Sequence, residues 1–305
     1  MSHTMIAVDP PDYTRLRKLV VRGFSATRVE ALRPRVQEIA DELLDAAASR
    51  DDVDLLEALA FPLPVRVIAD VLGVPSDIRD RLIAEAGAAS MVPMDAVATE
   101  MTALIEAGRA TPTDDLLTEL VAAHGDHQLT DVELVQMAGI LFAAGHVTTV
   151  HLILGGVRTL PRHPAQLAEL RRDPALVPHA FDELLRHVGP VPAISRYALD
   201  DVAIGGVTIP RGSHVTVALT TANHDPAAFT DPDTFDIHRN GTQDVAFGHG
   251  IHFCLGARLA KLEAEVAIDT LLCRFPELAL ADEPNGVESM LDAAQPLLVH
   301  LRRRP

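Results

Sequence analysis

The chain has 305 residues, of which 48% are hydrophobic and 23% charged, a composition typical of globular proteins of one or two domains. Its formal net charge of −17 excludes the basic face of a nucleic-acid-binding protein, and two cysteines are too few for a disulfide framework. No apolar run approaches the roughly 20 residues that cross a bilayer, and "MSHTMIAVDPPDY" lacks the pattern of a signal peptide, so we expect a soluble cytoplasmic protein without a membrane or nucleic-acid partner.

Helical patterns follow one another through the first two thirds of the chain. Helices are predicted over 10–24, 26–48 and 55–72, the last ended by "GVP", and as shorter Ala-rich pieces over 76–122. Prolines separate them: two begin the first helix, Pro34 interrupts the second early, and Pro93 and Pro112 interrupt the Ala-rich stretch.

The stretch 130–160 is predicted to be a long central helix. Thr130 and Glu133 have the spacing of a capping box, and the residues that follow are nearly all apolar, as in a helix buried on all sides. The alternating pattern over 200–221 predicts strands that turn at Gly205-Gly206. A further helix is predicted after Cys254. The chain contains no internal repeat and no low-complexity linker. We therefore expect one domain over residues 1–305, mainly α with a small β-sheet.

One cysteine has an unusual setting. In "FGHGIHFCLG" (247–256), Cys254 lies where a glycine-rich loop leads into a helix, whose partial positive charge and free N–H groups favour a thiolate. Glycines at 248, 250 and 256 let the backbone approach something flat and bulky, which suits an axial metal ligand. A buried structural cysteine and a nucleophile are the alternatives. Cys273, on the last helix, is predicted to be a buried inert thiol.

The loop resembles the haem-binding loop of cytochromes P450. The resemblance implies that Cys254 is the thiolate ligand to the iron of haem b, and that Phe247, Gly248 and Gly256 lie against that cofactor. Four further segments resemble family motifs in the right order: "DPPDYTRLRKLV" (9–20), "AAGHVTT" (143–149), "FDELLR" (181–186) and "DPDTFDIHR" (231–239). The expected fold is that of a cytochrome P450 lacking its N-terminal portion.

The "FDELLR" and "DPDTFDIHR" segments imply a buried ion-pair network. Glu183 and Arg186 are i,i+3 neighbours on one helical face and can pair, although such a pair on its own is more often a solvated surface feature. The resemblance adds Arg239 to that pair. It implies a structural role for all three residues, supporting the thiolate loop from behind.

Haem carries two propionates, whose burial requires partners. The resemblance assigns this binding to Arg17, Arg196 and His252. Where the family usually has a histidine four residues before the first arginine, this chain has Tyr13, which donates one hydrogen bond but carries no positive charge. We expect weaker anchoring of one propionate.

The distal motif departs from the family pattern. The resemblance implies that Thr148 holds the oxygen and its water, and that Gly145 lets the helix open to seat oxygen. The acid that precedes the threonine in the family, and helps to deliver protons, is replaced by Val147. His151, four residues further on, shares a face with Val147 and is a candidate substitute, although a histidine merely hydrogen-bonded in place is the alternative.

The resemblance implies a monooxygenase. It would take electrons from a ferredoxin or similar protein and put one oxygen atom into an apolar small molecule, in natural-product biosynthesis or catabolism. Alternatives are a haem-thiolate enzyme that uses peroxide or catalyses coupling or rearrangement, which Val147 favours, and a non-catalytic haem-binding relic. The family normally has a substantial segment before "DPPDYTRLR". Its loss would expose a sheet edge and predicts self-association or an open haem pocket.

Overall fold

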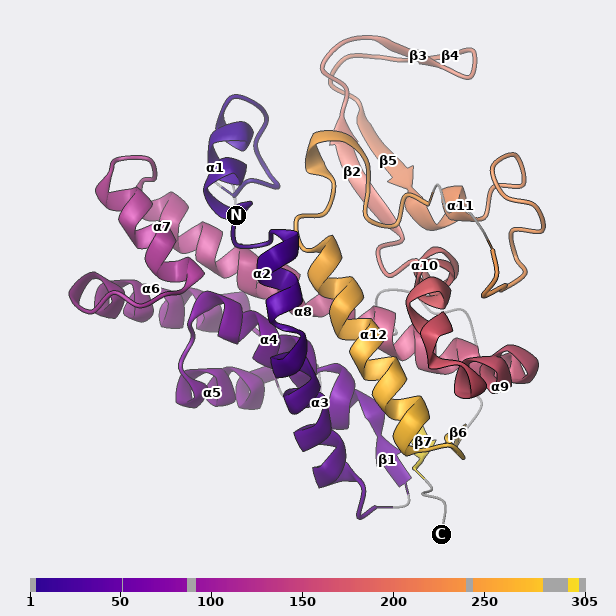
Figure 1. The fold of residues 1–305 in the computed structure, drawn as a ribbon. Coiled ribbons are helices and arrows are strands. Elements are labelled where there is room, and N and C mark those ends of the chain that lie inside the picture. The colour runs from indigo at the N-terminus through magenta and orange to yellow at the C-terminus, as the bar shows by residue number, and fades with distance from the viewer. Residues whose placement is uncertain (1–3, 51, 87–91, 240–243, 282–295, 302–305) are drawn as a thin grey trace.

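The computed structural model of the protein describes residues 4–50, 52–86, 92–239, 244–281 and 296–301 (Figure 1). The α-helices are α1 Asp12–Val20, α2 Ala26–Ala31, α3 Arg33–Ala47, α4 Pro62–Leu72, α5 Ser76–Ala86, α6 Met94–Ala110, α7 Leu116–Gly125, α8 Asp131–Arg162, α9 Pro164–Arg172, α10 Val177–Val188, α11 Leu219–Asn223 and α12 Ala257–Arg274. Three short turns of other helix types are η1 Leu56–Ala60, η3 Pro174–Leu176 and η4 Gly250–His252. The strands are β1 Asp52–Asp54, β2 Ala193–Tyr197, β3 Val202–Ile204, β4 Val207–Ile209, β5 His214–Ala218, β6 Ala279–Leu280 and β7 Leu298–His300.

Helix α8 runs through the middle of the molecule, as predicted. It packs against α4, α6, α10 and α12 (Figure 1). Its start is the predicted capping box: the Thr130 hydroxyl accepts from the Glu133 N–H at 3.2 Å, and the Glu133 carboxylate accepts from the Thr130 N–H at 2.9 Å. Contrary to the sequence expectation, α8 is long and apolar enough to cross a membrane, but 67% of its most apolar window is buried in the protein. It is therefore placed as a core helix.

Prolines set most helix boundaries where the sequence predicted them. Helix α2 ends before Leu32, and Pro34 lies in the first turn of α3, where its missing N–H costs nothing. The continuous helix predicted over 55–72 is wrong, because a short π-helical turn ends at Ala60 and α4 begins at Pro62. A proline cannot donate the hydrogen bond that would carry one helix through this point.

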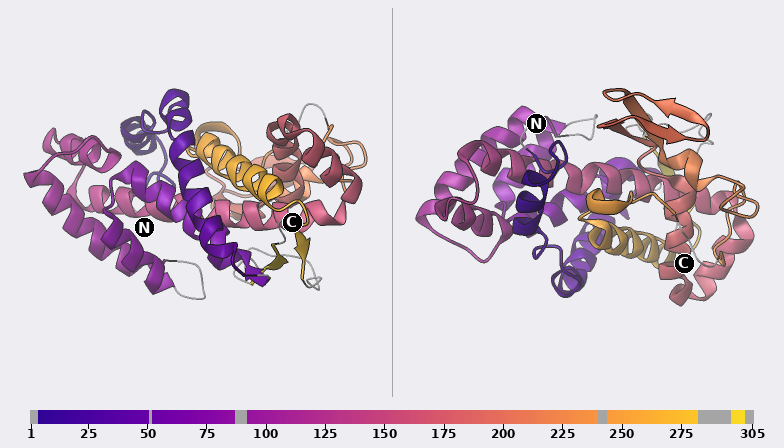
Figure 2. Two further views of the ribbon diagram at one scale, coloured as in Figure 1. Left: turned by 60° about the horizontal axis from the view of Figure 1, so that its bottom comes forward. Right: turned by 90° about the horizontal axis from the view of Figure 1, so that it is seen from above.

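The strands form three small antiparallel sheets, with the orders β1-β7-β6, β2-β5 and β3-β4. The predicted hairpin is confirmed: β3 and β4 join at Gly205 and Gly206, whose φ angles of 58° and 80° are those of a tight primed turn. Strand β2, which the sequence pattern did not reveal, pairs with β5 so that Arg196 lies opposite Val215. Figures 1 and 2 show the β2-β5 and β3-β4 sheets at one edge of the molecule, beyond the helices, while Figure 1 shows β1, β6 and β7 at the opposite end. The mainly α architecture with small sheets is confirmed.

The prediction for Cys273 is wrong. Leu271 and Leu272 of α12 are buried, but the next residue around the helix lies outside this buried stripe, and Cys273 is exposed. Its thiol donates to the Asp269 carboxylate at 3.7 Å. Most of the buried apolar residues in the described ranges belong to one cluster, which includes residues of α1 and of β7.

Candidate active site

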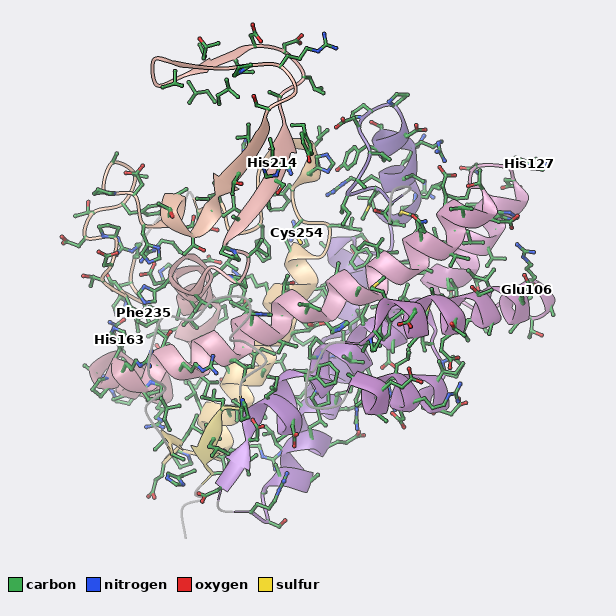
Figure 3. All side chains as sticks on the ribbon, turned by 180° about the vertical axis from the view of Figure 1, so that it is seen from behind. Glu106, His127, His163, His214, Phe235 and Cys254 are labelled. Atoms are coloured by element: carbon green, nitrogen blue, oxygen red, sulfur yellow. The ribbon has the colours of Figure 1, made fainter. Side chains whose placement is uncertain are left out.

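A cavity of about 420 Å³ opens between α8 and the loop that precedes α12. Figure 3 shows Cys254 at the start of α12, beside the middle of α8. The cavity walls contain every residue that the sequence proposed for the cofactor and for oxygen: Tyr13, Arg17, Gly145, Thr148, Arg196, Phe247, Gly248, His252, Cys254 and Gly256. Segments up to 243 residues apart in the sequence, from Tyr13 to Gly256, therefore meet at one site.

The cysteine loop turns tightly before α12. Gly248 and Gly250 have φ angles of 75° and 74°, in the left-handed region that glycine adopts without strain. The Gly248 N–H donates to the Val245 carbonyl at 2.8 Å, and the Cys254 N–H donates to the Phe247 carbonyl at 2.9 Å. These bonds fold the loop back on itself and hold the Cys254 backbone against the cavity.

The electrostatics of the sulfur differ from the sequence expectation. Burial raises the pKa of the Cys254 thiol, and the Gly256 N–H and the Arg17 charge oppose this rise without outweighing it. The expectation that the loop by itself favours a thiolate therefore gains no support, because burial of the half-buried Cys254 outweighs these two groups. A metal that binds this sulfur displaces its proton, so the ion would add stabilisation of the anion that the loop alone does not provide.

Three nitrogen donors lie around the cavity near the sulfur. Arg17 donates from Nη2 to the Phe253 carbonyl at 2.8 Å, and Arg196 donates from Nη1 to the Ser195 carbonyl at 2.8 Å. Burial, and then the charge of Arg196, lower the pKa of His252, so this ring is neutral at pH 7 and offers one N–H. The cavity thus combines a sulfur, two guanidinium groups and an imidazole with largely apolar walls.

Tyr13 occupies the fourth position in this group. Its ring centroid lies 4.3 Å from that of His252, and its hydroxyl donates to the Ile251 carbonyl. The donor that the family resemblance assigned to a propionate is therefore engaged by the backbone in this structure. Weaker anchoring of one propionate stays a prediction.

Helix α8 forms the opposite wall. A Cβ atom at Gly145 would lie 2.5 Å from Cγ1 of Ile68 on α4, so the close approach of the two helices requires a glycine here. The helix is continuous through this residue, and packing accounts for the glycine without an opening of the helix. Thr148 lines the cavity, whereas Val147 and His151 do not. Nδ1 of His151 lies 2.5 Å from the Val147 carbonyl oxygen. The proposal that His151 replaces the missing acid gains no support from this placement.

Glu263 is a buried carboxyl that the sequence analysis missed. It lies on α12, is completely buried, and neither of its carboxyl oxygens has a hydrogen-bond partner of normal geometry among the residues that the structure describes. Burial raises its pKa well above the usual range, opposed only by the side chain of Thr149 on α8. The signal was present: Glu263 follows Leu259 by four residues and precedes Val266 by three, on one helical face.

We expect Glu263 to make folding stability fall as pH rises. Both states hold the proton below the unfolded pKa of about 4.3; above it only the folded state does, so the free energy of unfolding decreases by about 1.4 kcal/mol per pH unit until the folded pKa is reached. Glu263→Gln, which cannot ionise, should lose this slope in denaturant titrations across that range. Glu57→Gln, at an exposed position on η1, is the control. Identical pH profiles for wild type and Glu263→Gln would contradict the assignment.

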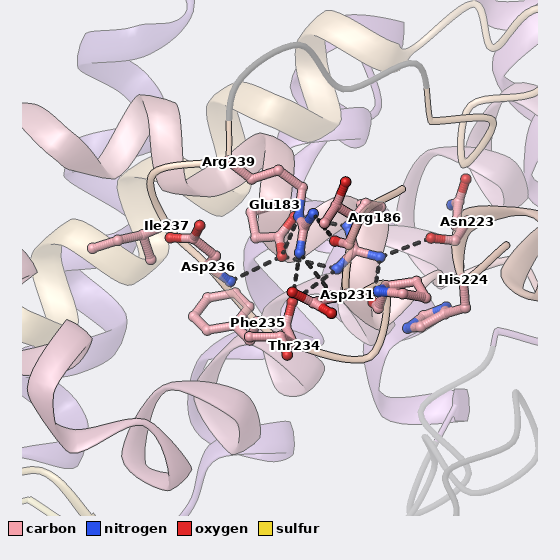
Figure 4. Close-up of polar contacts among 12 residues, drawn as sticks. Glu183, Arg186, Asn223, His224, Asp231, Thr234, Phe235, Asp236, Ile237 and Arg239 are labelled. Atoms are coloured by element: carbon pink, nitrogen blue, oxygen red, sulfur yellow. Dashed lines mark hydrogen bonds and ion pairs between the residues drawn. The ribbon is translucent and has the colours of Figure 1, made fainter. Parts of the chain in front are cut away.

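The three charged residues predicted behind the loop form one buried network (Figure 4). Arg186 donates to the two Glu183 carboxylate oxygens at 2.7 and 2.8 Å, and Arg239 donates to them from Nε at 3.1 and 3.2 Å. Glu183 also accepts from the Asp236 N–H at 3.0 Å. Arg186 has no exposed surface and Glu183 only 1%, so each charge depends on its partners for solvation.

Such a cavity, with one cysteine beneath a long central helix and an ion-pair network behind its loop, is the architecture of a haem-thiolate protein. The family model for cytochrome P450 matches residues 170–291. Cytochrome P450 107B1 of Saccharopolyspora erythraea is 48% identical over 296 residues, covering 93% of this chain and 72% of that protein. Cytochrome P450 monooxygenase PikC of Streptomyces venezuelae is 44% identical over 298 residues, with the same coverage.

A solved structure agrees with these sequence relatives. The tirandamycin C-bound P450 monooxygenase TamI matches with a TM-score of 0.85 at 43% identity, covering 98% of this chain and 77% of that one. The chain belongs to the cytochrome P450 family. It is a haem-thiolate monooxygenase, an oxidoreductase of the class that acts on small molecules and generally draws electrons from redox partners.

Proposed function

We propose that the cavity binds haem b with Cys254 as the iron ligand, and that Arg17, Arg196 and His252 hold the propionates. The observation that carries the proposal is that all four side chains line one cavity together with Thr148. The donor set suits the group: a sulfur for the metal, cationic donors for two carboxylates, and apolar walls for the macrocycle. When bound, haem supplies the activation of O2.

The residues of the chain would hold oxygen and water and exclude solvent from the cavity. Thr148 presents a hydroxyl to the cavity opposite Cys254 and would hold oxygen and water there by hydrogen bonding. The apolar side chains of Ile140, Leu141 and Leu152 line the same cavity and would exclude bulk water from the reacting region. Glu183, Arg186 and Arg239 keep a structural role behind the loop, and residues 1–305 act as a single domain.

The substrate we propose is an apolar small molecule of the natural-product type, because a relative of 43% identity is described with tirandamycin C bound. The electron donor would be a ferredoxin or similar protein, and the location the cytoplasm. Self-association stays a proposal, which the exposed Ile204 and Val207 of the β3–β4 hairpin support, and sedimentation would test it.

The activity can be tested by isotope transfer. The haem-loaded protein, a surrogate ferredoxin, its reductase and NADPH should place one labelled oxygen atom from O2 into an accepted apolar substrate. In a parallel experiment, peroxide is added to the haem-loaded protein without the ferredoxin, reductase and NADPH. Product that forms only in the peroxide arm would contradict reductive O2 activation and favour the peroxide-using alternative.

The absence of an acid at position 147 predicts leaky turnover. Val147 cannot pass on a proton, so we expect much of the reducing power to be lost as peroxide. Val147→Asp should raise the ratio of product to peroxide about tenfold, a modest share of what a positioned acid contributes. Product, peroxide and NADPH are measured together.

Two variants make this prediction sharper. An asparagine side chain has nearly the same shape as an aspartate but cannot ionise, so Val147→Asn should leave the ratio of product to peroxide low. His151→Ala should leave the ratio unchanged, because the His151 ring is engaged by the Val147 carbonyl. Tight coupling in the wild type that neither change at position 147 alters would show that water or the substrate supplies the protons.

A further inference from the structure

Asn223 connects the buried ion-pair network to the cysteine loop. It is the last residue of α11 and is completely buried. Its main-chain carbonyl accepts from Arg186 Nη1 at 2.7 Å (Figure 4). Its side-chain Oδ1 accepts from the Val245 N–H at 2.8 Å. One residue therefore bonds to the network with its backbone and to the start of the loop with its side chain.

The loop carries this contact onward to the sulfur-bearing residue. Val245 accepts from the Gly248 N–H at 2.8 Å, and Phe247, between them, accepts from the Cys254 N–H at 2.9 Å. A chain of hydrogen bonds thus leads from Glu183 through Arg186, Asn223 and the turn at 245–248 to the backbone of Cys254.

Only half of the Asn223 amide is used. Its Nδ2 is buried and has no hydrogen-bond partner in the described part of the chain, whereas Oδ1 makes the bond to Val245. Burying a whole amide to obtain one acceptor costs free energy, because the unused Nδ2 donor loses its hydrogen bonds to water. What position 223 needs is an acceptor of this shape that faces the Val245 N–H.

We propose that Asn223 is a positioning residue that sets the placement of the Cys254 loop relative to the Glu183–Arg186 pair. The inference rests on the proposed role of Cys254 as the iron ligand. A glycine-rich loop has many accessible backbone conformations, so its placement depends on bonds from outside the loop. Asn223 provides such a bond from a rigid, charged anchor, and it does not line the cavity itself.

The test compares two substitutions of similar size in the haem-loaded protein. Asn223→Leu removes the acceptor, and Asn223→Asp keeps it. Asn223→Leu should lower the ratio of the red-shifted, thiolate-ligated ferrous CO band to the unshifted band about tenfold, an effect of about 1.4 kcal/mol and within the range for a buried N–H left without an acceptor. Asn223→Asp should keep the wild-type ratio. Hydrogen exchange at the Val245 amide should be faster in Asn223→Leu only.

Gln166→Leu is the matched control. Gln166 accepts from the Ile237 N–H at 2.8 Å and donates to the Phe235 carbonyl at 2.7 Å, in the segment that passes the same network, but it makes no bond to the cysteine loop. This variant should be destabilised without a change in the CO band ratio. If Asn223→Leu does not accumulate in folded form, Asn223→Ala takes its place with the same expectation.

The possible results distinguish a failure of the proposed role of Cys254 from a failure of the proposed role of Asn223. A wild type without the red-shifted band would refute the proposed role of Cys254. A wild type with the band, and an Asn223→Leu variant with the same band ratio and the same exchange at Val245, would refute the role of Asn223. An equal loss of the band in Gln166→Leu would also refute it, since general destabilisation would then explain the effect.

Discussion

Cys254→Ser is expected to abolish the red-shifted Soret band of the reduced CO complex. That band reports a thiolate bound to iron, and Cys254 lines the cavity whose walls carry Arg17, Arg196 and His252. A serine hydroxyl has a far higher pKa than a thiol and is a poorer donor to a soft metal site, so the spectral signature should disappear even if some haem remains in the cavity.

The chain contains its own control for this experiment. Cys273 is the other cysteine, exposed at the end of α12 and bonded to Asp269. Cys273→Ser should leave the CO band and the haem content unchanged. A red-shifted band that persists unchanged in Cys254→Ser would refute the ligand assignment. Loss of the band in Cys273→Ser would instead indicate Cys273, at the other end of α12, as the iron ligand.

Glu183→Ala is expected to prevent stable folding or haem retention. The substitution leaves two arginines next to the vacated carboxylate site, and Arg186 has no exposed surface through which water could solvate its charge. Removing one partner of a buried ion pair costs about 3–5 kcal/mol, a large part of the total stability of a typical domain. The free energy of unfolding in denaturant and the haem content per chain are the two measurements.

An exposed ion pair is the control for Glu183. Glu30 bonds to Arg33 at the surface, where solvent screens the pair, so Glu30→Ala should leave the free energy of unfolding nearly unchanged. Glu183→Gln keeps the shape of the side chain and one acceptor but not the charge. Its free energy of unfolding should lie between those of wild type and Glu183→Ala. A folded, haem-replete Glu183→Ala protein with altered turnover alone would contradict the structural role of the network.

Local sequence determined the features that depend on neighbouring residues. The capping box at Thr130 and Glu133, the turn at Gly205-Gly206 and the start of α3 at Pro34 form from contacts within a few residues, and the structure has them where the patterns predicted. The loop of Cys254 was recognisable for the same reason, because its glycines and cysteine are contiguous in the chain. The motif order also indicated that separated segments would meet at one site.

Tertiary structure alone decided the features that depend on which segments meet. The thiol pKa of Cys254 is raised and not lowered because packing buries the sulfur, and Gly145 is required because Ile68 of another helix lies against it. No local pattern shows that Asn223 meets Val245, 22 residues further on, at the root of the cysteine loop. Burial and hydrogen bonding between distant segments are properties of the packed chain, so the energies that place the sulfur could be known only once the helices were assembled.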